Sequence, residues 1–278
     1  MSQRVLQFSV VGMAIILFLL LYFGGRTKPL NRSQIDKTRA LRAESTVDIA
    51  SLLQSAKENL TSEQLSPLLQ LESELENQKS DTNRVEILKK ISSEWNKLTN
   101  FALGGYYAEQ VAEILETDEA WSMAGTTYIL GGRSTQDEST RTYCINRAIT
   151  ALENAISINP TETAHKINLG LAKTESAQPM QGIMLLRGLL EKEPENTAVL
   201  MALGQLSIRS GQYDKAIERY QQVVKLEPKH LQAHLGLAQV FQQTDRKSEA
   251  REMYQKCIQL SDDERFKSGI QDILNQIK

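Results

Sequence analysis

The residues with most potential for chemistry are three histidines and two cysteines. His230 and His234 lie four positions apart, a spacing that puts two imidazoles on one helix face, where they could hold a metal ion. No third ligand and no His-Glu-x-x-His motif accompanies them, so we expect both to pack and assign no metal site. Cys144 and Cys257 fit neither a metal-binding spacing nor a disulfide framework.

Phosphate binding and nucleophilic catalysis also lack their motifs. The chain has no Gly-x-x-x-x-Gly-Lys-Ser/Thr loop and no Gly-x-Ser-x-Gly elbow. The glycine pairs at 24–25, 104–105 and 131–132 lack the strand-to-helix context of a phosphate site, so they indicate turns or close contacts between helices. We therefore predict no catalytic residue, no cofactor, no small-molecule substrate and no enzymatic activity.

The composition favours helices. Of 278 residues, 41% are hydrophobic, only 6% are aromatic, and Gly and Pro number 15 and 6, which is too few for a turn-rich sheet protein. Ala, Leu, Glu, Gln and Lys are abundant, and these residues favour helix. The net charge of −2 argues against a nucleic-acid partner. The predicted fold class is all-α.

The N-terminal segment is typical of a membrane anchor. Residues 5–25 contain no charge, and about 20 apolar residues span a bilayer core. No Ala-x-Ala pattern or cysteine follows, which favours an uncleaved single-pass transmembrane helix over 1–25, with a cleaved signal peptide as the alternative. The first residues beyond the anchor are basic: Arg26, Lys28, Arg32, Lys37, Arg39 and Arg42. Positive charge favours the cytoplasmic side, so we expect the remaining chain in the cytoplasm, and the extracytoplasmic alternative stays open.

From residue 163 the chain repeats itself every 34 residues, in the windows 163–196, 197–230 and 231–264. The residues that coincide are Leu169-Gly170, Leu203-Gly204 and Leu237-Ala238; Gly182, Ala216 and Ala250; and Leu186, Tyr220 and Tyr254. The glycine and alanine residues among them are small enough to let two antiparallel helices approach closely. Pro194 and Pro228 close two of the windows, because proline cannot continue a helix.

This pattern resembles the tetratricopeptide repeat. The resemblance extends to 118–162, where Trp121, Ala124, Gly125 and Tyr128 match the first helix, and to a degenerate repeat over 85–117. An insertion of about eleven residues, judged by the 34-residue period, predicts a long loop at 131–140. The resemblance implies an α-solenoid of helix pairs, similar to bacterial single-span tetratricopeptide proteins.

The flanking segments complete the predicted architecture. Residues 26–84 form a basic flank and an extension of two or three helices, with a dimerising coiled coil as the alternative. Pro67 predicts a helix start near Ser66, and Thr61-x-x-Gln64 offers a competing start. At 265–278 an apolar stripe predicts a helix that caps the last repeat. The stripe consists of Phe266, Ile270, Ile273, Leu274 and Ile277.

The resemblance also implies a binding groove lined by the first helix of each repeat. The residues at groove positions are Ser122, Thr126, Ile167, Leu171, Met201, Gln205, Arg209, Gln232, Leu235, Gln239 and Gln242. They lack the Lys, Arg and Asn cluster with which some family members clamp a C-terminal carboxylate. A mixed apolar and amide groove suits a protein or peptide segment with a few apolar anchors. The alternative is that these residues only contact neighbouring repeats.

Two functions follow from this architecture. The first is a membrane-tethered scaffold that binds a partner protein, similar to family members that help assemble cytochrome c or other envelope complexes. The second is a permanent structural subunit of a larger membrane complex, whose interface would be larger and more apolar.

Overall fold

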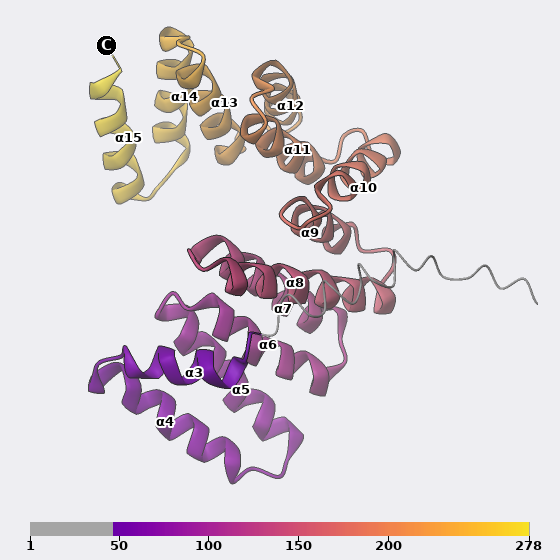
Figure 1. Ribbon diagram of the computed structural model, residues 1–278. Coiled ribbons are helices and arrows are strands. Elements are labelled where there is room, and N and C mark those ends of the chain that lie inside the picture. The colour runs from indigo at the N-terminus through magenta and orange to yellow at the C-terminus, as the bar shows by residue number, and fades with distance from the viewer. Residues whose placement is uncertain (1–46, 278) are drawn as a thin grey trace, which may run out of the picture. The chain divides into compact units, whose positions relative to one another are not determined.

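The computed structural model describes residues 47–277, and this part of the chain is all-α, as predicted. It contains thirteen helices, followed in order in Figure 1: α3 (Ile49–Glu58), α4 (Ser62–Glu76), α5 (Asp81–Lys97), α6 (Phe101–Leu115), α7 (Asp118–Ser134), α8 (Glu138–Ile158), α9 (Thr163–Thr174), α10 (Pro179–Lys192), α11 (Thr197–Arg209), α12 (Tyr213–Leu226), α13 (Leu231–Gln243), α14 (Lys247–Leu260) and α15 (Glu264–Gln276).

The predicted transmembrane helix over 1–25 and the basic flank as far as residue 46 lie outside the described residues. Between residues 47 and 277, none of the helices combines the length and the hydrophobicity that a membrane span requires.

The helices pack as successive hairpins. The hairpins are α5 with α6, α7 with α8, α9 with α10, α11 with α12, and α13 with α14. Figure 1 shows them following one another from purple (α5 and α6) to orange (α13 and α14). The first helices α7, α9, α11 and α13 also contact one another in sequence, so they form a continuous wall, as the solenoid prediction requires.

The repeated small residues provide the close packing between hairpins. Tyr220 on α12 is 1% exposed, and its ring lies against Gly204 on α11 and Gly236 on α13. A Cβ atom at Gly204 or Gly236 would stand 2.6 or 2.7 Å from this ring. The predicted helix crossing at Gly204 and the fully buried Ala216 is therefore present. It also joins one repeat to the next.

The predicted long loop at 131–140 is wrong. Helix α7 continues to residue 134 and α8 starts at residue 138, so the insertion lengthens both helices. Gly131 and Gly132 are not turn residues, because they lie where α7 touches its neighbours: a Cβ atom at Gly131 would stand 3.0 Å from Cys144 Sγ. The carboxylate of Asp137 accepts a hydrogen bond from the first turn of α8 and starts that helix.

Of the two helix starts that the sequence offers here, the one near Ser66 is wrong and the competing one at Thr61-x-x-Gln64 is confirmed. Helix α4 begins at Ser62 because Thr61 and Gln64 form a capping box, in which each side chain accepts a hydrogen bond from the other's backbone N–H. Pro67 lies inside the helix. It removes one backbone donor, a loss that the capped first turn and the packing of fully buried Leu68 outweigh.

A helix lies where the capping helix was predicted. Ile270, Leu274 and Ile277 of the C-terminal segment are buried in one cluster with Tyr254 of α14. Arg251 of α14 donates hydrogen bonds to the last carbonyl groups of this segment, at Leu274 (3.0 Å) and Ile277 (2.8 Å). Apolar burial and a satisfied helix end together hold α15 on the last hairpin.

Two glycines on α10 should respond oppositely to alanine. A Cβ atom at Gly182 would collide with the backbone of α9, at the Gly170 carbonyl oxygen and 2.7 Å from Thr174 N, whereas Gly188 has open space. Gly182→Ala should therefore destabilise the protein by about 1–3 kcal/mol. Gly188→Ala should stabilise it by about 0.5–1 kcal/mol through helix propensity. Urea unfolding of both variants checks this, and equal effects would contradict the packing of α9 on α10.

Candidate functional site

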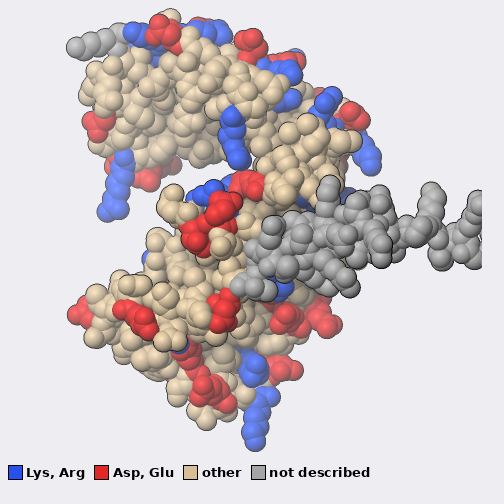
Figure 2. Space-filling model, viewed as in Figure 1, with Lys and Arg blue, Asp and Glu red and all other residues tan. Residues whose placement is uncertain are grey.

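The wall of first helices contains an open cleft of about 810 Å³. Figure 2 shows the surface hollowed here, with acidic and basic side chains gathered in the hollow. The cleft is lined by Gly132, Arg133 and Arg141 from α7 and α8; Thr174 and Glu175 at the end of α9; Met201, Gln205, Ile208 and Arg209 from α11; Tyr220 from α12; and Gln232, Leu235, Gly236 and Gln239 from α13.

The cleft gathers six of the eleven predicted groove residues: Met201, Gln205, Arg209, Gln232, Leu235 and Gln239. The other five lie elsewhere. Ile167 is buried in the core between α9 and α11, and Leu171 packs against the same core. Gln242 accepts a 2.6 Å hydrogen bond from the Tyr254 hydroxyl. Thr126 donates to the backbone carbonyl of Ser122 on its own helix. The contacts of Ile167 and Leu171 support the alternative that some inner positions only join repeats, whereas the bonds of Gln242 and Thr126 lie within one hairpin or one helix.

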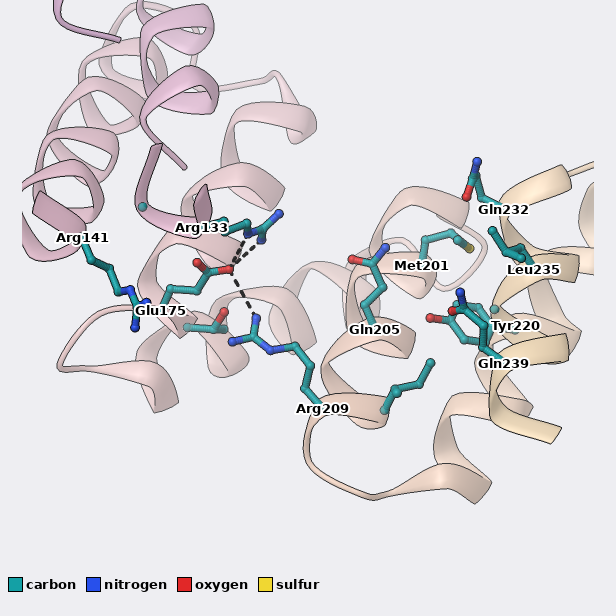
Figure 3. Close-up of a pocket in the computed structure, with 14 residues that line it drawn as sticks. Arg133, Arg141, Glu175, Met201, Gln205, Arg209, Tyr220, Gln232, Leu235 and Gln239 are labelled. Carbon is teal, nitrogen blue, oxygen red and sulfur yellow. Dashed lines mark hydrogen bonds and ion pairs between the residues drawn. The ribbon is translucent and has the colours of Figure 1, made fainter. Parts of the chain in front are cut away.

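A bridge of charges closes one end of the cleft. Glu175, whose side chain is 12% exposed, accepts hydrogen bonds at Oε1 from Arg133 Nε (2.8 Å) and from Arg209 Nη1 (3.3 Å). Figure 3 shows this carboxylate between the two guanidinium groups, one from α7 and one from α11. Both arginines are largely exposed, so the bridge contributes little stability and its arginines can change partners.

The charged end has an excess of positive charge. Arg141 also lines it and pairs with Glu138 at 3.3 Å, a residue outside the lining. Three arginines therefore border the cleft with one glutamate. Guanidinium groups bind carboxylates through paired hydrogen bonds, so this end suits an acidic group.

The other end repeats one chemistry along the wall. Gln205 on α11 and Gln239 on α13 occupy equivalent positions 34 residues apart, and so do Met201 and Leu235. An amide side chain both donates and accepts hydrogen bonds, as a peptide backbone does. Burial raises the pKa of Tyr220 to about 12, so its hydroxyl keeps its proton in the cleft at neutral pH. This end suits a polypeptide with apolar side chains.

The sequence analysis missed Arg133, Arg141 and Glu175. Glu175 is the thirteenth residue of its repeat, as Arg209 is of the next, so the positional rule that found Arg209 could have found it too. Arg133 and Arg141 gave no such signal. They reach the cleft because the insertion extends α7 and α8, where a loop was predicted.

A Ser-His-Asp arrangement joins α7 to α9. His165, 6% exposed, bonds Ser122 Oγ through Nδ1 (3.1 Å) and Asp118 Oδ2 through Nε2 (3.0 Å). These are the residue types of a serine nucleophile site, but such a site also needs free backbone donors for an oxyanion. Ser122 lies inside α7, where the backbone donors bond within the helix. The arrangement therefore ties two repeats together.

The buried carboxylate Glu109 and the two cysteines also lie in surroundings that disfavour catalysis. Buried Glu109 accepts hydrogen bonds from Arg147 and from the Tyr128 hydroxyl, so its charge is paired. Burial raises the pKa of Cys144 to about 12 and that of Cys257 to about 11, which disfavours a thiolate nucleophile.

The two histidines with metal-type spacing are likewise structural. His230 caps α13 by accepting a hydrogen bond from the Ala233 backbone N–H (3.2 Å), and buried His234 contacts the Pro228 carbonyl (2.9 Å). Among residues 47–277, no three potential ligands gather into a metal site.

Comparison with known proteins identifies the repeat. The model of the tetratricopeptide repeat family matches residues 207–269, which include α12, α13 and α14. Residues 207–269 therefore carry the tetratricopeptide repeat. No curated protein matches it in sequence. A tetratricopeptide repeat protein from Parabacteroides merdae has a similar fold at 11% identity, with a TM-score of 0.53 over 77% of this chain and 79% of the other.

Two further structures are similar to this chain with lower TM-scores. MamA from Desulfovibrio magneticus is 18% identical, with a TM-score of 0.42 over 63% of this chain and 94% of the other. YrrB, described as a protein with an unusual peptide-binding site, is 15% identical, with a TM-score of 0.39 over 70% and 98% of the two chains.

The tie between α7 and α9 should weaken in acid. A hydrogen bond from His165, helped by one from Asn159, lowers the pKa of Asp118 from 3.8 to about 2. A carboxyl group with a depressed folded pKa stabilises the protein above its unfolded pKa and loses this effect as the pH falls through the folded value. Asp118→Asn should therefore be less stable than the parent at pH 6, with the difference shrinking between pH 4 and 2.

Urea midpoints at pH 6, 4, 3 and 2 measure this difference. Asp272→Asn, at an exposed position on α15, serves as the control variant. A difference between Asp118→Asn and the parent that stays constant below pH 4 would show that the carboxylate contributes no acid-sensitive stability.

Proposed function

We propose that this protein is an interaction scaffold that binds a segment of a partner protein in the 810 Å³ cleft. The observation that carries the proposal is the equivalence of Gln205 with Gln239 and of Met201 with Leu235 on touching helices. A wall that presents the same pair of side chains at successive repeats matches a ligand that is itself a regular polymer. A polypeptide has this property, and enzymatic chemistry has no place in the proposal.

The two ends of the cleft suit two different kinds of group on the partner segment. The amide and apolar end suits backbone groups and aliphatic side chains, and the arginine end suits an acidic residue. Arg133 and Arg209 share a single oxygen of Glu175, so a ligand carboxylate could take one guanidinium while the other keeps its bond. Binding would then exchange one ion pair for another, and the arginine that keeps its bond would still pair the charge of Glu175.

We further propose that residues 1–25 tether the scaffold to a membrane. The support is the uncharged stretch of residues 5–25 with basic residues beyond it. A tether of this kind would hold the partner beside the bilayer, which is consistent with a role in assembling an envelope complex, as in cytochrome c biogenesis. The repeat domain would lie on the cytoplasmic side.

Photocrosslinking tests the cleft. A photoreactive amino acid at Gln239 should crosslink the full chain to a partner protein in cells, because this side chain borders the cleft. The same amino acid at Gln221, exposed on α12 and outside the cleft, is the matched control. Equal crosslinking from both positions would refute binding in the cleft, and an obligate partner that survives purification at fixed stoichiometry would favour the structural subunit.

Deletion and fusion test the tether. Removing residues 1–25 should move the protein from the membrane fraction to the soluble fraction, because the remaining chain has no comparable uncharged stretch. A reporter that is active only outside the cytoplasm, fused after Lys278 of the full chain, should stay silent. An active reporter would reverse the orientation, and membrane binding that survives the deletion would remove the tether.

A further inference from the structure

A second cleft, of about 650 Å³, lies between α10 and the hairpin of α11 and α12. The clefts share Thr174 and Arg209, at the ends of α9 and α11, and the remaining residues of the second cleft are its own. The second helices α10 and α12 both contribute to its lining, so it is not part of the wall of first helices. Neither the repeat pattern nor the proposed scaffold role assigns a function to it.

The floor of the second cleft is apolar. Ile183 and Leu190 project from α10, and Leu200, Leu203 and Leu206 from α11. Leu200 and Leu203 belong to the buried core, whereas Ile183, Leu190 and Leu206 are partly exposed. A partner side chain that covered these three would remove apolar surface from water, at about 25 cal/mol per Å².

The rim of the second cleft is mainly basic, and Glu218 is the single carboxylate in its lining. Arg187 comes from α10, and Lys215 and Arg219 lie four residues apart on α12, so both project from one face of that helix. Within the described residues none of the three forms an ion pair with a carboxylate. Lys215 donates to Gln212 at 2.7 Å, and Arg219 donates to the Leu203 carbonyl at 2.9 Å.

The charges on this rim repel one another. Burial lowers the pKa of Arg219, Glu218 partly opposes this effect, and the guanidinium of Arg187 adds to it. Arg219 is half-buried, and its neutral partners, the Leu203 carbonyl and the Ser207 hydroxyl, do not neutralise its charge. This differs from the first cleft, where Arg133 and Arg209 already share Glu175. An anion placed between α10 and α12 would relieve the repulsion.

We propose that the second cleft binds an acidic segment of a partner protein. Its Asp or Glu carboxylates would lie between Arg187, Lys215 and Arg219, and its apolar side chains would cover Ile183, Leu190 and Leu206. Charge complementarity selects an acidic ligand, and guanidinium groups pair with carboxylates bidentately. The apolar floor selects a polypeptide over a lipid headgroup, because a headgroup carries nothing to place on it.

The test measures affinity for a defined peptide. The probe is a fluorescent twelve-residue peptide in which Glu and Leu alternate. It is added to the full-length protein in non-ionic detergent. Arg187→Glu and Lys215→Glu reverse two exposed rim charges that hold no core contact. Lys192→Glu on α10 and Lys225→Glu on α12 are the matched controls, since they make the same charge change on the same helices outside the cleft.

We expect each rim variant to weaken binding at least tenfold and each control to change it less than twofold. A peptide with Gln in place of Glu should bind at least tenfold more weakly than the acidic peptide. Arg187 and Lys215 line only the second cleft, so weakening by their variants separates this proposal from the first one. Gln221→Ala, at an exposed position outside both clefts, should leave the affinity unchanged. Circular dichroism melts confirm that the variants fold.

Three results would overturn the proposal. The first is no binding of the acidic peptide by the parent protein. The second is equal weakening by rim and control variants, which would indicate attraction by overall charge. The third is a result in which the rim variants lose binding to vesicles rich in phosphatidylserine but keep binding to the peptide. That result would assign the rim to a membrane surface.

Discussion

The ring of Tyr220 lies between two glycines that belong to successive repeats. Gly204 and Gly236 remove the Cβ atoms that would otherwise hold α11 and α13 apart from α12, and one aromatic ring then occupies the space. Because this single contact joins three helices, it sets the spacing of the wall on which Gln205 and Gln239 stand. The same ring also borders the first cleft, so one side chain both packs the helices together and forms part of the proposed binding surface. A larger residue at either glycine would move both.

The sequence predicted those elements whose repeated residues serve only to pack helices together. The small positions exemplified by Ala216 and Ala250 are fully buried, and the C-terminal stripe of Ile270 and Leu274 packs on α14. Such positions repeat every 34 residues because each hairpin solves the same packing problem. The repeat period therefore located α9 to α14 from the chain alone.

The errors arose where one residue type serves two purposes. The predicted loop at 131–140 placed Gly131 and Gly132 in a turn, but glycine equally permits the close approach of helices, and the neighbours of α7, such as Cys144 on α8, decide between the two. Pro67 favoured a helix start near Ser66, but of the two starts that the sequence offered it is the capping box at Thr61 that forms, so α4 begins at Ser62. For the cleft, the positional rule could not distinguish Met201, which borders it, from Ile167, which is buried at the same repeat position. Whether such a position is buried or borders a cleft depends on the separation of neighbouring hairpins, which a local sequence pattern does not specify.

Arg209 borders both clefts and donates its hydrogen bond to Glu175. A single flexible side chain cannot extend into two ligands at once. Two acidic ligands that each recruited this guanidinium would therefore compete for it, although their binding surfaces are otherwise separate. Linkage makes such antagonism reciprocal: whatever factor the first ligand removes from the affinity of the second, the second removes from the first. The end of α11 is thus a point at which occupancy of one cleft would change the affinity of the other without any change in the backbone.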